Sequence, residues 1–393
     1  MALPSLKTLE ECAEYSKVVE PYLPQLYELP WQAYDAATSS DASLLDLYKN
    51  TNPLISGLGF SVLLGAVFLV VSEINRNYSQ VDRMWSLLPT VYNAHFALWS
   101  RLNNLPTRRV DLILLWSAVW SARLTFNYWR KGGYQKGSED YRWYGRQSAR
   151  ATRSLSAHKA SRETIRGKVP PALFFVFNVT FISFIQSILL CLLAAPTYII
   201  LLTTQFEPEV TTADLAYFAI ELLLILSEWF SDQQQWDYQT AKKQYQKTAK
   251  VPRGFSQEDL DRGFVTTGLW AYCRHPNFAA EQTIWFVLYQ WSCYASKTLY
   301  GWAGFGCLFL IMLFQGSTWL TELITAGKYP EYGLYQKKVP PFFPSLKPVQ
   351  GTSPTPQEQG DGGNSCWASI LMVVQHAADD DAGIAGRAAA CDP

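Results

Sequence analysis

The sequence predicts an all-α membrane protein, a polytopic helical bundle with about seven transmembrane helices. Hydrophobic residues make up 49% of the 393 residues and aromatic residues 15%, whereas only 17% are charged. Such a composition is unusual for a soluble fold. The fifteen tryptophans indicate contact with lipid interfaces. Long apolar runs also recur along the chain, and a bilayer crossing needs about 20 such residues per helix.

The clearest apolar run, PLISGLGFSVLLGAVFLVV at residues 53–71, contains no charged residue and predicts a span. Six further segments of similar character follow it. They are residues 85–99, 110–129, 170–202, 213–230, 278–294 and 301–323. Several carry polar residues, which explains a mean hydropathy of −0.04. A soluble all-helical protein is the alternative, and the uncharged first run argues against it.

Three parts follow one another along the chain. A polar N-terminal segment, residues 1–50, is acidic and lacks a basic start followed by an apolar core, so we expect no cleavable secretory signal. The first span is therefore expected both to anchor and to target the chain. The membrane body covers residues 53–345. The tail, residues 346–393, mixes Gly, Pro, Ala and Asp, cannot bury a core, and is predicted to be disordered.

The distribution of lysine and arginine predicts the orientation in the membrane. Residues 130–168 and 242–262 are basic, whereas the intervening turn at 205–214, QFEPEVTTAD, is acidic. This alternation places the N-terminus in the lumen or outside and the C-terminus in the cytosol, and we expect the endoplasmic reticulum membrane. One loop disagrees, because it places three arginines on the lumenal side, namely Arg101, Arg108 and Arg109.

Several classes of site have no support in the sequence. The seven cysteines form no C-x-x-C pair, so we expect neither a disulfide framework nor a zinc site, and the scattered histidines indicate no metal cluster. No G-x-G-x-x-G follows a strand and no P-loop is present, so any dinucleotide site would be built from helix ends and loops. The basic residues flank the spans, and therefore no nucleic-acid partner is expected.

The most informative segment is GLWAYCRHPNFAAEQTIW at residues 268–285. Arg274 and His275 precede a proline at a helix start, where free backbone N–H groups favour anions, so the segment predicts a phosphate-binding arrangement. Asn277 and Glu281 are four residues apart and share a helix face. A carboxylate at bilayer depth costs about 2.5–3.5 kcal/mol, so Glu281 is expected to have a partner or a function. A purely structural cap with a snorkelling arginine is the alternative.

Other blocks add polar residues at or near the spans. Residues 221–243 place Glu228 and Asp232 one turn apart, suited to ribose hydroxyls or an amide, although a polar face packed on another span is the alternative. The block QVDRMWSLLPTVYNAHF contributes Asp82 and Tyr92. The block WSARLTFNYWRKGGYQKGSEDYRWYGRQ contributes three more candidates, Arg123, Asn127 and Tyr128. It also holds an acidic-basic trio, Glu139, Asp140 and Arg142. We expect this trio either to form a loop scaffold around the site or to make salt bridges only.

The last block, GSTWLTELITAGKYPEYGLYQKKVPPFFP, places Glu322 in a span ahead of Tyr332, basic residues and a Pro-aromatic stop. Four earlier features belong with it: the Arg-His-Pro-Asn-Phe segment, the Asp-x-x-Gln helix, the Asp-Arg-x-Trp-Ser stretch and the Glu-Asp-Tyr-Arg stretch. With them, the chain resembles the steroid 5α-reductase-like membrane oxidoreductases, a group that includes the DUF1295 proteins, over residues 54–344. The resemblance implies NADPH-dependent reduction of a carbon-carbon double bond in a steroid, sterol or other lipid drawn from the bilayer.

The resemblance also implies residue roles. Its cofactor-binding residues would be Arg274, His275, Asn277, Glu228, Asp232, Gln235, Arg262, Arg123, Asn127 and Tyr332. The group that polarises the substrate carbonyl would come from Asp82, Tyr92, Tyr128 and Glu281. Trp120 stands where the mammalian steroid enzymes carry a carbonyl-holding tyrosine, so a fatty-acyl, polyprenyl or other enone-like lipid fits as well as a steroid 3-ketone.

Three other hypotheses about the function stay open. An isoprenylcysteine-type membrane methyltransferase uses a similar Arg-His-Pro turn to hold S-adenosylmethionine, although the Asp-x-x-Gln helix and the Glu-Asp-Tyr-Arg block favour the reductase. A nonenzymatic lipid-binding protein could retain the same fold. A transporter fits less well, because the charged groups gather at the cytosolic end and no inverted repeat is evident.

Overall fold

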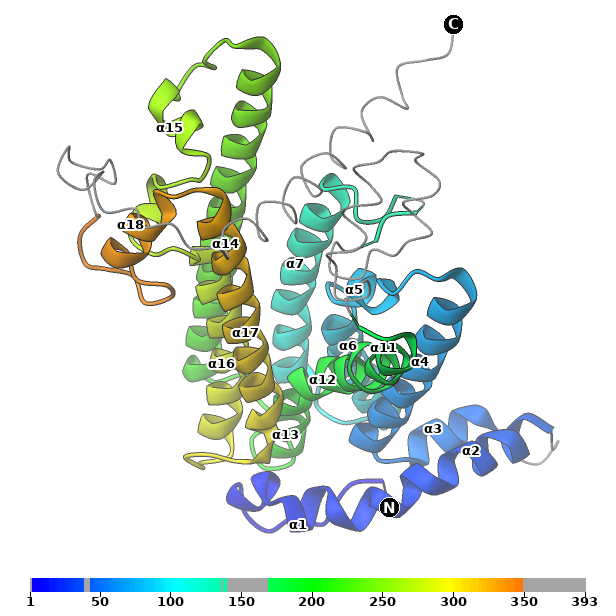
Figure 1. The fold of residues 1–393 in the computed structure, drawn as a ribbon. Coiled ribbons are helices and arrows are strands. Elements are labelled where there is room, and N and C mark those ends of the chain that lie inside the picture. Colours follow the sequence, from blue (N-terminus) through cyan, green and yellow to red (C-terminus); the bar gives the residue numbers. More distant parts are fainter. Residues whose placement is uncertain (1, 39–42, 136, 140–168, 349–393) are drawn as a thin grey trace, which may run out of the picture. The chain divides into compact units, whose positions relative to one another are not determined.

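The computed structural model describes residues 2–38, 43–135, 137–139 and 169–348, and every regular element in these ranges is a helix. The predicted all-α class is confirmed there. The chain divides into two compact units. The first unit holds Met1–Asp140, Ala172–Ile225 and Gln282–Met312, and the second holds Tyr141–Pro171, Leu226–Glu281 and Leu313–Pro393. Three helices contribute to both units, namely α14 (Thr212–Thr248), α16 (Pro276–Ala295) and α17 (Phe305–Lys328) (Figure 1).

Each of the seven segments predicted to span the bilayer is helical. Besides α14, α16 and α17, they are α4 (Pro53–Asn75), α6 (Leu88–Leu102), α7 (Arg108–Arg130) and the continuous run of α11 (Pro171–Phe177), η3 (Asn178–Ile185), α12 (Gln186–Leu193) and α13 (Ala195–Thr203). In the described part of the chain, three stretches are long and apolar enough to cross a membrane: Pro53–Asn75, Pro171–Thr203 and Trp302–Lys328. These stretches indicate a membrane protein, and the count of seven spans stays a prediction.

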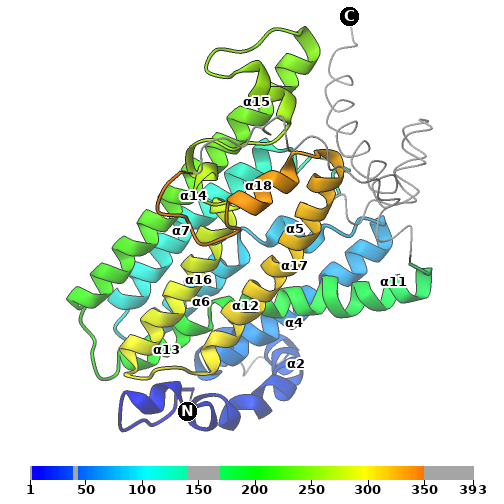
Figure 2. The same cartoon turned by 60° about the vertical axis from the view of Figure 1, so that its left-hand side comes forward.

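The N-terminal segment is folded into short helices. They are η1 (Glu10–Ala13), α1 (Tyr15–Val18), η2 (Glu20–Tyr22), α2 (Leu23–Thr38) and α3 (Leu44–Asn50). Both views show this segment crossing the N-terminal end of α4 (Figures 1 and 2). The first candidate span therefore begins next to a layer of short helices that belongs to the same unit.

Local capping determines where α4 begins. The side chain of Asn52 accepts a hydrogen bond from the backbone N–H of Leu54 at 2.9 Å, and Pro53 occupies the first helical position. Asn52 is fully buried, and its amide donates to the Tyr198 hydroxyl on α13 at 2.9 Å. The cap is therefore also a tertiary contact between two apolar helical runs.

Small polar side chains join α6 and α7. The Thr90 hydroxyl donates to the Ser117 carbonyl at 2.7 Å, and the Ser121 hydroxyl donates to the carbonyl of Ser86, which follows α5 (Gln80–Met84), at 2.6 Å. Hydroxyls that bond to a neighbouring backbone allow helices to approach closely where water is scarce.

The loop that disagreed with the predicted orientation has a specific structure. Each of its arginines pairs with a carboxylate: Arg101 with Asp111, Arg108 with Glu209, and Arg109 with Asp214. The third pair is buried, since the two side chains are 1% and 0% exposed. The basic residues of this loop are therefore bound within the first unit, although the orientation itself stays a prediction.

The second unit is built around the C-terminal part of α14, with α15 (Gln257–Arg262), η4 (Gly268–Ala271) and α18 (Tyr332–Lys338). The Tyr238 hydroxyl on α14 donates to the Asp259 carbonyl at 2.7 Å, so α15 lies against α14, as both views show. Gly263 ends α15 at a φ of +85°, and a Cβ there would lie 2.1 Å from the Tyr329 ring. Only glycine fits this position without movement of the ring.

Candidate functional site

The Arg274–His275 pair stands immediately before Pro276, the first residue of α16, in the second unit. Arg274 forms a two-pronged ion pair with Glu322 of α17, with Nε 2.7 Å from Oε1 and Nη2 3.0 Å from Oε2. Nε2 of His275 lies 2.8 Å from the same Oε1. All three side chains are buried, at 7–9% exposure. Such charge-assisted, bidentate contacts are among the stronger hydrogen bonds in proteins.

Two side chains from the C-terminal end of the unit complete the shell around Glu322. Nε2 of Gln336 donates to Oε2 at 2.9 Å, and the Tyr332 hydroxyl donates to Oε1 at 3.4 Å. Burial, followed by the nearby Glu322 carboxylate, raises the pKa of the Tyr332 hydroxyl, so it stays a proton donor near neutral pH.

The remaining donors of the motif bind backbone carbonyls of the C-terminal segment. Nη1 of Arg274 donates to the carbonyls of Gln336 and Val339. The backbone N–H of Arg274 donates to the Pro340 carbonyl at 2.9 Å, and the backbone N–H of His275 donates to the Pro341 carbonyl at 3.1 Å. The motif therefore docks residues 336–341 onto the start of α16. A phosphate placed on the Arg274 guanidinium would have to displace the Glu322 carboxylate.

The segment ahead of the motif is tied to α14. The Gln234 side chain accepts a hydrogen bond from the backbone N–H of Leu269 at 3.0 Å, and Nε1 of Trp270 donates to the Ser231 carbonyl at 3.3 Å. Gly268 has a φ of +64°, and a Cβ there would lie 2.6 Å from the Gln234 amide. The Gly-Leu-aromatic start of the motif is therefore explained by its close approach to the stretch of α14 that carries Asp232 and Gln235.

Some buried oxygens of the second unit have no hydrogen-bond donor among the described residues. They include Oε1 of Gln235, Oδ1 of Asn277 and Oγ1 of Thr318. Asn277 lies two residues after His275, and Thr318 lies one helical turn before Glu322. Buried acceptors are almost always paired, and leaving one unpaired costs about 1–3 kcal/mol. The unsatisfied oxygens therefore identify these side chains as candidates for contact with a bound donor.

The other candidates of the second unit are placed differently. Glu228 and Glu281 are buried at 2% and 9% exposure, and Asp232 is half-buried. Arg262 contacts Asp259 at 2.8 Å and two further glutamates, at 3.5 and 3.9 Å. Burial by itself raises the pKa of Asp259. Hydrogen bonds from Ser256 and Arg262 together lower that pKa by more, so the pKa lies below its ordinary value. Arg262 is therefore surrounded by acidic groups.

The first unit holds the remaining candidates. Arg123 and Asn127 are buried on one face of α7, as predicted from their spacing. Tyr92 is 1% exposed, and its hydroxyl has no hydrogen-bond partner in the part of the chain that the structure covers. Asp82 is half-buried on α5, and the Tyr128 ring packs edge-on against Tyr134 at 4.9 Å.

The acidic-basic trio is only partly described. A carboxylate oxygen of Glu139 accepts a hydrogen bond from the backbone N–H of Tyr78 at 2.8 Å. This contact fits the predicted role as a loop scaffold. Asp140 and Arg142 lie outside the described residues, as does the tail from residue 349 onward.

Some residues of the site carried no signal in the sequence. Gln336 and Gln234 look like surface glutamines in a polar helix, and their roles depend on partners far away in the chain. Lys242 is 7% exposed and donates to the Gly263 carbonyl at 3.1 Å and to the Tyr329 hydroxyl at 3.2 Å. Among the residues with a described placement, no group of His, Cys, Asp and Glu could hold a metal ion.

Comparisons with known proteins identify one family and one relative. The DUF1295 family, described as "Protein of unknown function", matches residues 68–339. An uncharacterized protein of Schizosaccharomyces pombe is 38% identical over 346 residues, which cover 88% of this chain and 93% of the yeast protein. No solved structure matches the chain. The matched region includes the whole Arg274–Glu322 cluster.

Proposed function

We propose that this chain, which belongs to the DUF1295 family, is a membrane-embedded, NADPH-dependent oxidoreductase that reduces a carbon-carbon double bond in a lipid. The observation that carries the proposal is the pair of unsatisfied amide oxygens in the second unit, Oδ1 of Asn277 and Oε1 of Gln235. Both stand on the segments that resemble the dinucleotide-binding elements of the steroid 5α-reductase-like group.

The donors of a nicotinamide nucleotide match these acceptors. Its carboxamide offers two N–H donors and its riboses offer hydroxyls, whereas the two amide oxygens can only accept. A hydrogen bond from the cofactor would remove the desolvation cost of each buried oxygen. When bound, the cofactor supplies the hydride, and the protein supplies orientation and a proton.

The phosphates need cations that are not already paired. Arg274 is engaged by Glu322, so we assign it a positioning role, and Arg262 is surrounded by acidic groups. Four exposed cations follow α14 or end it, and in the described ranges none of them pairs with a carboxylate: Lys243, Lys247, Lys250 and Arg253. Such a group favours anions, and its arginine matches phosphate oxygens in a bidentate geometry.

For the proton donor, Tyr92 is the first residue to test. Its hydroxyl is buried, and no acceptor for it lies among the described residues. A phenol in this state can donate a hydrogen bond to the carbonyl of an enone-like lipid and give its proton to the resulting enolate, at its oxygen or α-carbon. The phenolate that remains would have to be reprotonated before the next turnover. We further propose that the protein resides in the endoplasmic reticulum membrane with a lumenal N-terminus and a cytosolic C-terminus.

The binding test compares NADPH with S-adenosylmethionine by thermal shift of detergent-purified protein. Asn277→Ala and Gln235→Leu remove the unsatisfied oxygens without breaking the Glu322 cluster, so their unliganded Tm should match or exceed that of the wild type. Each should raise the Kd for NADPH roughly tenfold, as expected for the loss of one hydrogen bond of about 1.4 kcal/mol. Gln244→Ala is the matched control, because Gln244 is an exposed amide on α14, the helix that carries Gln235. This variant should bind NADPH normally.

Two outcomes would contradict the proposal. Stabilisation by S-adenosylmethionine and not by NADPH would favour the methyltransferase reading. Stabilisation by neither, in protein that melts cooperatively, would favour a nonenzymatic lipid-binding protein. If NADPH binds, turnover of enone-like lipids in proteoliposomes, followed by NADPH absorbance, identifies the substrate class.

A further inference from the structure

Helix α2 exposes a stripe of large aromatic side chains that nothing in the described chain covers. Tyr27, Trp31 and Tyr34 are 78%, 74% and 64% exposed. They are spaced i, i+4 and i+7, so they share one side of the helix. Elsewhere on α2, Leu26 and Leu29 lie against Gly59 of α4, whose missing side chain leaves space for them. The aromatic stripe is therefore separate from the packing face.

The position of α2 places this stripe at the end of a candidate membrane span. The Gln25 side chain accepts a hydrogen bond from the backbone N–H of Asn52 at 2.9 Å, and Asn52 caps α4. α4 is the most apolar of the candidate spans. Both views show α2 lying across the N-terminal end of α4 (Figures 1 and 2). The stripe thus lies at the level where a spanning α4 leaves the bilayer.

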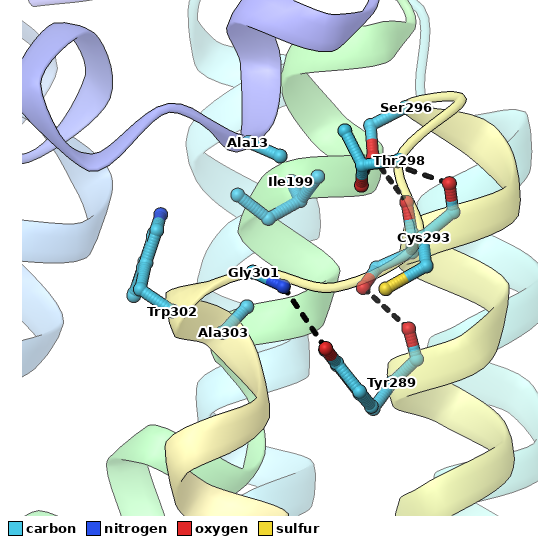
Figure 3. A pocket seen from close by; sticks show the side chains of 10 residues that line it. Ala13, Ile199, Tyr289, Cys293, Ser296, Thr298, Gly301, Trp302 and Ala303 are labelled. Atoms are coloured by element: carbon cyan, nitrogen blue, oxygen red, sulfur yellow. Dashed lines mark hydrogen bonds between the residues drawn. The ribbon is translucent and has the colours of Figure 1, made fainter.

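A second segment of the first unit exposes apolar side chains at the same end of the unit. Leu299 and Tyr300, in the loop between α16 and α17, are 89% and 83% exposed. This loop contacts the N-terminal segment: Ala13 and Trp302 line one small cavity, as Figure 3 shows. Exposed aromatic residues in a ring around a bundle are typical of the membrane–water interface.

Charge identifies the kind of lipid. The polar side of α2 carries Glu28, Gln32 and Asp35, and the helix contains neither lysine nor arginine. Residues 1–50 as a whole hold eight carboxylate side chains against three lysines. Anionic lipids attract basic segments and repel acidic ones. An aromatic stripe beside an acidic face therefore fits the headgroup zone of zwitterionic lipids.

We propose that α2 is an interfacial helix that lies in the plane of the membrane, with its aromatic stripe inserted among zwitterionic lipid headgroups and its acidic side in water. This contact adds a second membrane attachment beside the spans. It also holds the capped end of α4 at the bilayer surface. The proposal stands independently of the reductase chemistry, because it concerns only the N-terminal segment and the adjoining loop.

The test attaches one environment-sensitive fluorophore to α2 in full-length protein in phosphatidylcholine nanodiscs. Trp31→Cys and Glu28→Cys are labelled in a background with Cys366→Ser and Cys391→Ser; the other five cysteines are buried. Interfacial helices bury their apolar side about 5–10 Å into the headgroup and acyl boundary. Doxyl-phosphatidylcholine should therefore quench the label at position 31 roughly threefold more than at position 28, and aqueous iodide should show the opposite order.

Three results would contradict the proposal or a part of it. Equal access of iodide to both labels, without doxyl quenching, would show that α2 stands away from the bilayer. Protection of position 31 from both quenchers would show that protein, such as a second copy of the chain, covers the stripe. Replacing a third of the phosphatidylcholine by phosphatidylserine should weaken the doxyl quenching at position 31, and an increase would contradict the zwitterionic preference.

Discussion

Arg274 and Glu322 lie 48 positions apart in the chain, yet they form a buried, two-pronged ion pair in which Nε lies 2.7 Å from Oε1 and Nη2 lies 3.0 Å from Oε2. The same guanidinium also binds the carbonyls of Gln336 and Val339. One side chain therefore joins the start of α16, the body of α17 and the segment around α18. The consequences of this arrangement can be measured directly.

Glu322→Gln should strongly destabilise the protein, because it leaves the buried Arg274 cation without its carboxylate. Breaking a buried pair by removing one partner costs about 3–5 kcal/mol. The free energy of unfolding, measured by denaturant titration in detergent, checks this value. Glu331→Gln is the control, since Glu331 is 44% exposed and 3.9 Å from Arg262, and should cost at most about 1 kcal/mol. Equal costs for both variants would show that the cluster contributes little.

Gly263→Ala should be considerably more destabilising than Gly254→Ala. Both glycines have a positive φ, +85° and +89°, so both substitutions carry a backbone cost of about 1–2 kcal/mol. At position 263 a Cβ also meets the Tyr329 ring at 2.1 Å, whereas nothing lies within 4 Å at position 254. The difference between the two unfolding free energies isolates the steric contact. A difference near zero would mean that the ring moves aside freely.

Tyr92→Phe should reduce kcat about 10²- to 10⁴-fold if Tyr92 is the general acid, with the KM for NADPH unchanged. Its stability should not fall, because the hydroxyl has no partner among the described residues. Tyr198→Phe is the matched control: that hydroxyl accepts from Asn52 at 2.9 Å and donates to the Val18 carbonyl at 3.0 Å. It should lose about 1–3 kcal/mol of stability and keep its kcat. Unchanged kcat in Tyr92→Phe would remove Tyr92 from the mechanism.

The Cys273 thiol should resist alkylation in the folded protein. Burial raises its pKa above the ordinary value of 9.0, and the thiol donates to the carbonyls of Pro341 and Phe342 at 3.1 and 3.3 Å. The Cys273 thiol ionises at a lower pH in the unfolded chain than in the folded protein. The stabilisation that comes from burying the neutral thiol is therefore present below pH 9 and is lost as the pH rises further. Comparing the alkaline unfolding of the wild type with that of Cys273→Ala tests the sign, and a steeper loss in the variant would contradict it.

Arg109→Ala should cost about 3–5 kcal/mol, whereas Arg108→Ala should cost less than about 1 kcal/mol. Arg109 and Asp214 are 1% and 0% exposed, and Nε1 of Trp291 donates to the same carboxylate at 2.7 Å. Arg108 and Glu209 are about 70% exposed, so water screens their attraction. Thermal unfolding of both variants separates a buried structural pair from a surface pair, and similar losses would refute the distinction.

Local sequence information was sufficient for much of the fold. The apolar run at 53–71 corresponds to α4, and membership in the DUF1295 family is confirmed. The link to steroid 5α-reductases and the NADPH chemistry stay predictions. Helix ends were less accurate: the run predicted at 213–230 continues as α14 to Thr248. The apolar pattern stops near residue 230, but glutamine, lysine and alanine continue the helix beyond it because their helix propensity is high.

The sequence by itself determined the helical class, the starts of helices such as α4 and the presence of a polar motif before α16. These features depend on neighbours within a few residues, namely a cap, a proline or an apolar period. Only the tertiary structure decided that Arg274 meets Glu322 and not a free anion, and that α2 turns its aromatic side away from α4. Contacts between distant segments depend on how helices pack, and no local pattern specifies that packing.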